Sequence, residues 1–79
     1  MAEYNRTNMI QAIKSHAEGH IKKHTMNVEV YLNNPVGVGE HPDIIEAIEK
    51  ELDMVAKYHD QLEVIKNYIE KDPLKPNVQ

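Results

Sequence analysis

The sequence predicts an all-α fold, in which two long helices pack side by side as an antiparallel, coiled-coil-like hairpin. Glycine and proline, which interrupt helices, number three and four, and five of these seven residues lie in segments 33–41 and 72–79. Elsewhere, apolar residues recur three and four positions apart, the spacing of one helix face. We expect a single domain over residues 1–79, with helices at about 8–32 and 42–71, a connector at 33–41 and a tail at 72–79.

The first predicted helix has a cap at its start and one apolar stripe. Thr7 or Asn8 can cap it, and Gln11 would complete a capping box if Asn8 is the cap. Residues 27–32 (NVEVYL) are rich in β-branched side chains and could form a strand. Because no other segment offers a partner strand, we interpret them as helix. The stripe consists of Ile10, Ile13, Ala17, Ile21, Val28 and Leu32.

The second predicted helix carries the most regular apolar pattern of the sequence. Pro42 suits its first position, and Asp43 and Glu46 would then lie in the first turn, where the helix dipole favours negative charge. Pro73 ends it, because the residue before a proline is held away from helical geometry. Its stripe, with positions three and four apart, is Ile45, Ile48, Leu52, Val55, His59, Leu62, Lys66 and Ile69.

Folding the chain back at the connector brings the two stripes together. Each position of the first stripe then meets an apolar or small position of the second, except that Ala17 meets His59. The predicted pairs are Val28 with Ile48, Ile21 with Val55, Ala17 with His59, and Ile13 with Leu62. This agreement between two separately identified stripes is the main reason for predicting a hairpin.

The predicted hairpin has more apolar surface than one seam can bury. Both helices carry small or apolar residues outside their stripes, and a chain of this length makes a marginal core by itself. We therefore expect oligomerisation, or docking on a larger assembly, to complete the fold. The predicted interface residues are Ala12, Ser15, Gly19, Met26 and Val30 opposite the seam of the first helix, and Ala47, Met54, Tyr58 and Ile65 beside the seam of the second.

No set of residues has the spacing of a catalytic or cofactor-binding motif, so we expect a protein that is not an enzyme and holds no cofactor. The absence of cysteine excludes disulfides and thiolate metal sites. His16, His20 and His24 recur four apart, and neighbouring pairs could share a metal ion such as zinc. Glu18 is not placed as in HExxH, and His24 turns towards the seam while His16 turns to solvent, so we predict no metal site.

Histidine chemistry nevertheless gives the alternative function: a small metal- or pH-responsive helical regulator that uses His16, His20 and His24. His59 in the predicted seam adds to this alternative. If it is partly buried, burial disfavours its charged form, and association then depends on pH.

Charge indicates the class of partner. The formal net charge is −4; residues 1–33 carry four basic and three acidic side chains, and residues 43–72 carry four basic and nine acidic ones. An acidic second helix disfavours nucleic acid and membrane surfaces and suits a protein partner. The start of the chain lacks the pattern of a signal peptide, and no apolar run reaches the length of a membrane span.

The middle of the chain resembles a small uncharacterised protein encoded by contractile-tailed marine cyanophages. The residues that carry the resemblance are His20-Ile21-Lys22-Lys23-His24 and the stretch from Asn33 to Ile48, of which NPVGVGEHPD (34–43) is the most specific part. The resemblance implies no functional residues. It implies a viral setting, as a virion component or a host-directed adaptor, located in the virion or the host cytoplasm.

Overall fold

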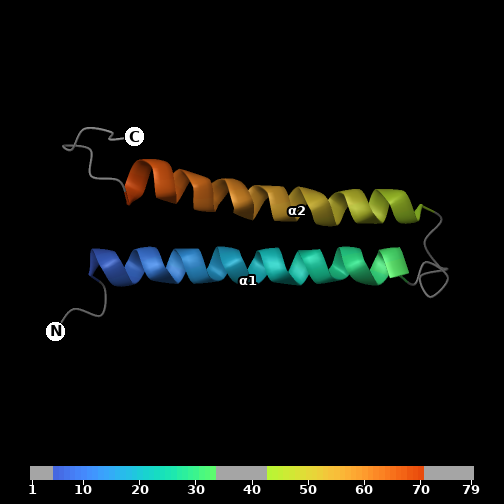
Figure 1. Cartoon of the computed structure of the whole chain (residues 1–79), viewed down its shortest axis with the longest axis horizontal. Helices are drawn as coiled ribbons and strands as arrows, with labels where there is room; N and C mark the ends of the chain where they lie inside the picture. Colours follow the sequence, from blue (N-terminus) through green and yellow to red (C-terminus); the bar gives the residue numbers. More distant parts are fainter. Residues whose placement is uncertain (1–4, 34–42, 71–79) are drawn as a thin grey trace.

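Two antiparallel helices lie side by side along their whole length (Figure 1). The computed structural model describes residues 5–33 and 43–70. Helix α1 spans Arg6–Asn33, and helix α2 spans Ile44–Val64 and continues into one turn of π-helix, η2, at Ile65–Ile69. The predicted all-α hairpin is thus confirmed, whereas its completion by oligomerisation stays a prediction. All of the predicted connector except Asn33, the predicted helix start at Pro42, and the whole predicted tail lie outside the described residues.

Helix α1 begins earlier than the sequence predicts. The Oδ1 atom of Asn5 accepts a hydrogen bond of 2.7 Å from the backbone N–H of Asn8, so Asn5 is the cap. The prediction of Thr7 or Asn8 as the cap, with Gln11 completing it, is therefore wrong. At the other end, residues 27–32 are helical, which confirms helix over strand for this segment.

Helix α2 begins immediately after its cap. Oδ1 of Asp43 accepts a 2.8 Å hydrogen bond from the backbone N–H of Glu46, and Ile44 is the first helical residue. Asp43 therefore precedes the first turn in which the sequence predicted it, while Glu46 lies in that turn as expected. The helical segment ends in η2, where the backbone N–H of Glu70 bonds to the carbonyl of Ile65 at 2.8 Å.

The predicted register between the helices agrees with the observed contacts. His24 lies beside Glu51, and His20 lies against Tyr58. The His24–Glu51 pair has the offset of the predicted pairs, and the His20–Tyr58 pair is shifted from it by about two residues, which is less than one helical turn. The sequence therefore placed the helices correctly along their axes.

The rotation of α2 about its own axis differs from the prediction. Tyr58 and Ile65 are only 8% exposed and face α1, whereas His59, predicted in the seam, is exposed. The neighbouring position differs by about 100° around a helix, so the seam takes Tyr58 instead of His59. The physical reason is that a phenol ring offers more apolar area than an imidazole and stacks on His20 from α1.

Polar contacts close the end of the hairpin where α1 begins. Nη2 of Arg6 donates to the backbone carbonyl of Ile69 at 2.6 Å, and Nζ of Lys14 lies 2.9 Å from Oε2 of Glu70. Carbonyl groups at the end of a helix lack partners within the helix, and positive charge is favoured there. These contacts hold η2 against the first turns of α1.

Candidate functional site

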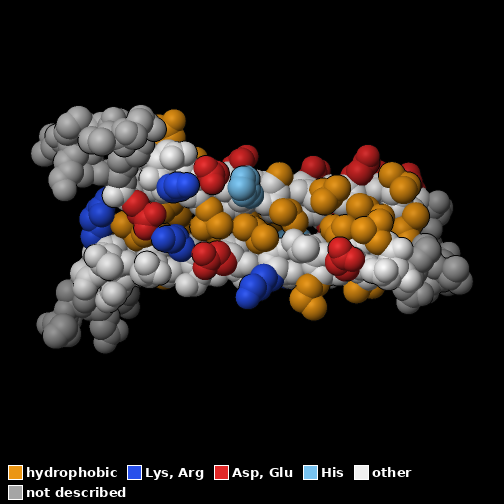
Figure 2. Space-filling view, in the orientation of Figure 1, with side chains coloured by type: hydrophobic (Ala, Val, Ile, Leu, Met, Phe, Trp, Pro, Cys, Tyr) orange, Lys and Arg blue, Asp and Glu red, His pale blue; other side chains and the backbone are white. Residues whose placement is uncertain are grey.

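One side of the seam carries a continuous apolar surface that the hairpin leaves open. In Figure 2, hydrophobic side chains from both helices meet along the seam, most densely in the half that contains the end of α1 and the start of α2. Leu32, Ile45 and Leu52 are 57%, 62% and 50% exposed. We call this surface the apolar flank and define it as those three residues with the half-buried Ile21, Val28, Ile48 and Val55.

Helical geometry places these residues together. Measured from the fully buried Ala17, Ile21 lies about 40° to one side around α1, and His20 lies about 60° to the other. On α2, Leu52 lies about 120° from the buried Tyr58. The stripe predicted for α2 therefore lies partly outside the intramolecular seam, and its outer half forms the flank.

The predicted interface residues divide into two groups. Those of α1 all lie on its open face: Met26 and Val30 are exposed, and a Cβ atom built on Gly19 would meet nothing within 4 Å. Those of α2 do not: Tyr58 and Ile65, predicted to form a second contact surface beside the seam, are instead buried in the seam itself. The five open residues of α1 are Ala12, Ser15, Gly19, Met26 and Val30, and the half-buried pair on α2 is Ala47 and Met54.

The apolar flank was not predicted from the sequence, because the periodicity assigned Leu32, Ile45 and Leu52 to the seam. A signal was present in the width of the apolar arc of α2, which covers about half of the circumference. Packing against a single neighbouring helix covers only part of an arc this wide. The part of the arc that the seam leaves open can therefore contact a second surface.

The three histidines of α1 form a ladder on the side of the seam away from the apolar flank. The ring centroids of His16 and His20 are 4.4 Å apart, and those of His20 and His24 are 5.9 Å apart. The ring of Tyr58 stacks on His20 at 4.5 Å, and Nζ of Lys57 lies 5.2 Å from the centroid of the Tyr58 ring. We call His16, His20 and His24 the histidine ladder.

His24 is tied to α2 through a carboxylate. Its Nδ1 donates to Oε1 of Glu51 at 2.7 Å, and Nδ2 of Asn27 donates to the same oxygen at 2.9 Å. The hydrogen bond from His24, followed by that from Asn27, lowers the pKa of Glu51. His24 is buried and His16 is exposed, as the sequence predicted.

Within the histidine ladder, His20 has a ring nitrogen that lacks a hydrogen bond. Its Nδ1 atom is buried and has no hydrogen-bond partner. Burial, and then the neighbouring His16, lowers the pKa of His20, so the neutral ring is favoured. Among residues 5–33 and 43–70, no three histidine or carboxylate side chains are grouped as a metal ion requires.

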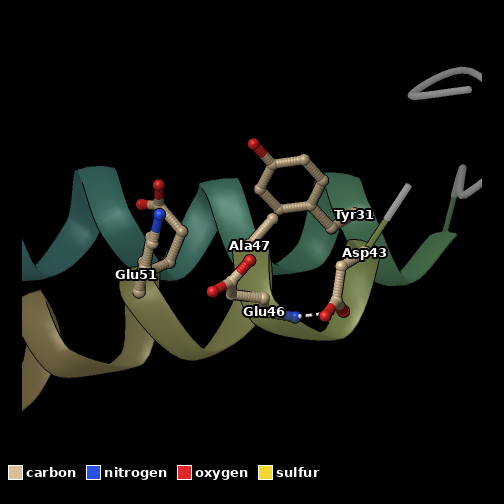
Figure 3. Close-up of a pocket in the computed structure, with 6 residues that line it drawn as sticks. Tyr31, Asp43, Glu46, Ala47 and Glu51 are labelled. Atoms are coloured by element: carbon tan, nitrogen blue, oxygen red, sulfur yellow. Dashed lines mark hydrogen bonds between the residues drawn. The ribbon is translucent and has the colours of Figure 1, made fainter. Parts of the chain in front are cut away.

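A shallow depression lies between the end of α1 and the start of α2 (Figure 3). Its carboxylates are largely engaged, because Asp43 caps α2 and Glu51 binds His24 and Asn27. Its described lining residues include no serine, threonine, cysteine or histidine. The lining residues are Tyr31, Asp43, Glu46, Ala47, Lys50 and Glu51.

The fold and these surfaces define a class: an all-α helical hairpin with one open apolar side. Comparisons with known protein families, with curated proteins and with solved structures each found no match to this chain. In the part of the chain that the structure describes, neither helix combines the length and the apolar character that crossing a membrane requires.

Proposed function

We propose that this protein is a non-enzymatic interaction module whose apolar flank is covered by protein. The observation that carries the proposal is the exposure of Leu32, Ile45 and Leu52, each at half of its surface or more, on the same side of a two-helix chain. Single exposed apolar residues are ordinary, but a contiguous group spanning two elements marks a contact surface.

The thinness of the core supports the same proposal. Among the described residues, no large side chain is fully buried, and the buried set consists of Ala17, His24, Tyr58 and Ile65. A hairpin of this size gains little stability from such a core. A partner that covers the flank adds apolar burial and stabilises the folded state by mass action.

Charge favours protein over other partners. The outer face of α2 is acidic, with exposed Glu49, Asp53, Asp60 and Glu63. Such a face repels phosphate groups, so nucleic acid and anionic membranes are disfavoured, and it complements a basic protein surface. In the viral setting that the resemblance implies, the module would serve as a virion component or a host-directed adaptor.

The test is the accessibility of the flank in the cells that naturally make the protein. The chain contains no cysteine, so Leu52→Cys and Gln61→Cys each introduce a single thiol on α2. We expect a maleimide to react at least several-fold more slowly with Leu52→Cys in lysate than after unfolding, because protein covers the flank. Gln61→Cys, exposed on the other side, should react at the same rate in both. Unhindered reaction of both thiols in lysate would contradict the proposal.

A pH-responsive regulator is a second candidate, favoured by the buried and unpartnered Nδ1 of His20. Protonating this ring places charge beside His16 and Lys57 in a partly dry seam. The metal-responsive version has less support, since the described histidines and carboxylates are not grouped around a common point. Thermal unfolding with zinc and with a chelator tests that version: equal melting temperatures are expected, and a zinc-dependent rise would favour it.

A further inference from the structure

We propose that the occupant of the apolar flank is a second copy of this chain, packed flank to flank in a four-helix bundle with the Asn33 ends of both α1 helices at the same end. This inference rests on the proposed function, because it names the partner of the same surface. Three features of the hairpin carry it: the width of the flank, its position along the helices, and the opposite charges of α1 and α2.

The width of the flank fits a pair of helices. It is built from both α1 and α2, so each helix of a second hairpin can lie against one helix of the first. Two hairpins packed in this way give a square four-helix arrangement with the flank residues inside, the ordinary solution for chains whose helices are apolar on more than one side.

Symmetry leaves two ways of placing the flanks face to face. A two-fold axis parallel to the helices puts α1 of one copy beside α2 of the other and keeps equivalent ends together. A two-fold axis perpendicular to the helices, lying in the plane of the interface, puts α1 beside α1 and α2 beside α2 and brings opposite ends together. Both are isologous contacts, in which the same patch is used twice.

The position of the flank along the helices selects the first arrangement. Its residues lie in the half of the hairpin that runs from Ile21 and Val55 to Leu32 and Ile45. The other half of that side carries the Lys14–Glu70 ion pair, because Lys14 lies about five helical turns from Leu32, and Glu70 about five from Leu52, so each falls on the same helix face as its counterpart. Equivalent ends together bring apolar half against apolar half, with Leu32 of one copy facing Ile45 of the other. Opposite ends together would press the apolar half against an ion pair and desolvate its charges.

Charge selects the same arrangement. Residues 6–33 carry four basic and two acidic side chains, and residues 44–70 carry three basic and seven acidic ones. The parallel axis places each positive α1 beside a negative α2, whereas the perpendicular axis places two negative α2 helices together. Charge of this exposed kind adds little affinity, but it discriminates between orientations.

The first experiment measures mass in solution at neutral pH. Light scattering on the eluting protein should give twice the 9.1 kDa of the chain at high concentration and fall towards 9.1 kDa on dilution. Leu52→Glu should remain at the monomer mass, because it places a carboxylate inside the flank. Gln61→Glu adds the same charge to an exposed position of the same helix and should still dimerise. A monomer at every concentration, or any stoichiometry other than two, would overturn the inference.

The second experiment fixes the orientation. Nitroxide labels on Asn33→Cys, or on Thr7→Cys at the other end of α1, report the distance between equivalent sites in the dimer. With equivalent ends together, both label pairs should lie about 20–30 Å apart, from helix spacings of about 8–10 Å and the reach of the labels. With opposite ends together, both would exceed about 40 Å, the length of a 28-residue helix. Long distances would overturn the proposed arrangement.

The two proposals fail differently. If the purified chain is monomeric while Leu52→Cys stays protected in native lysate, another protein covers the flank; the interaction module then stands and the second copy is wrong. If Leu52→Cys is unprotected in lysate and in the concentrated pure protein, both are wrong.

Discussion

The imidazole ring of His20 lies almost flat on the phenol ring of Tyr58, with centroids 4.5 Å apart and planes 11° apart. This contact fixes the rotation of α2 against α1, because it turns Tyr58 into the seam and leaves His59 outside. The same rotation moves Leu52 and Ile45 out of the seam and creates the apolar flank.

Replacing Tyr58 with alanine should destabilise the fold far more than replacing His59. We expect Tyr58→Ala to lower the free energy of unfolding by about 3 kcal/mol, the lower end of the range for buried aromatic residues. His59→Ala should change it by less than about 0.5 kcal/mol, because His59 is exposed. Urea unfolding followed by circular dichroism measures both. A larger effect at His59 would show that the seam is the one predicted from sequence.

Acid should destabilise the hairpin in two steps. The folded state lowers the pKa of His20 below 6.5, chiefly through burial, and that of Glu51 below 4.5, chiefly through its hydrogen bond with His24. For a lowered pKa, the stabilisation is complete above the unfolded value and is lost as pH falls through the folded value. The melting temperature should therefore be level above pH 6.5 and decline below it, with a second decline below 4.5.

Variants separate the two steps. His20→Gln removes the titrating ring and should flatten the upper decline, while Glu51→Gln should remove the lower one at some cost in stability at neutral pH. An unchanged upper decline in His20→Gln would assign it to another group. The groups that face His20 are His16, Lys23 and His24 from α1, and Lys57 and Tyr58 from α2.

The caps give a test of where each helix begins. Asn5→Ala and Asp43→Ala each remove an oxygen that accepts a backbone N–H, at 2.7 and 2.8 Å, and should each cost about 1 kcal/mol. Thr7→Ala, at one of the two cap positions predicted from the sequence, should cost much less. The measurement is the urea midpoint, and a greater loss at Thr7 than at Asn5 would contradict the observed start of α1.

The Lys14–Glu70 ion pair should contribute little to the free energy of unfolding. Lys14 and Glu70 are partly exposed, and pairs of this kind contribute about 0.2–1 kcal/mol. A double-mutant cycle with Lys14→Ala and Glu70→Ala measures the coupling, which should shrink in high salt. A coupling above about 2 kcal/mol that survives salt would show that this end of the hairpin is drier than the structure indicates.

The sequence was sufficient for the two helices and their register, and insufficient for the rotation of α2. Periodic apolar spacing sets which segments are helical, and a short connector between antiparallel helices leaves little freedom along their axes. The apolar arc of α2 is wide enough that several rotations bury similar area. The choice depends on contacts between the helices, His20 with Tyr58 and His24 with Glu51, which spacing alone does not specify. Cap positions were ambiguous because Asn5, Thr7 and Asn8 are all capping residue types.

The central claim is that the apolar flank is buried by a second copy of the chain, and its most direct test is the dependence of thermal unfolding on protein concentration. A folded dimer that dissociates on unfolding melts at higher temperature as concentration rises. We predict such a rise for the natural sequence and for Gln61→Glu, and none for Leu52→Glu. A melting temperature that stays constant over a hundred-fold range of concentration in the natural sequence would contradict the account.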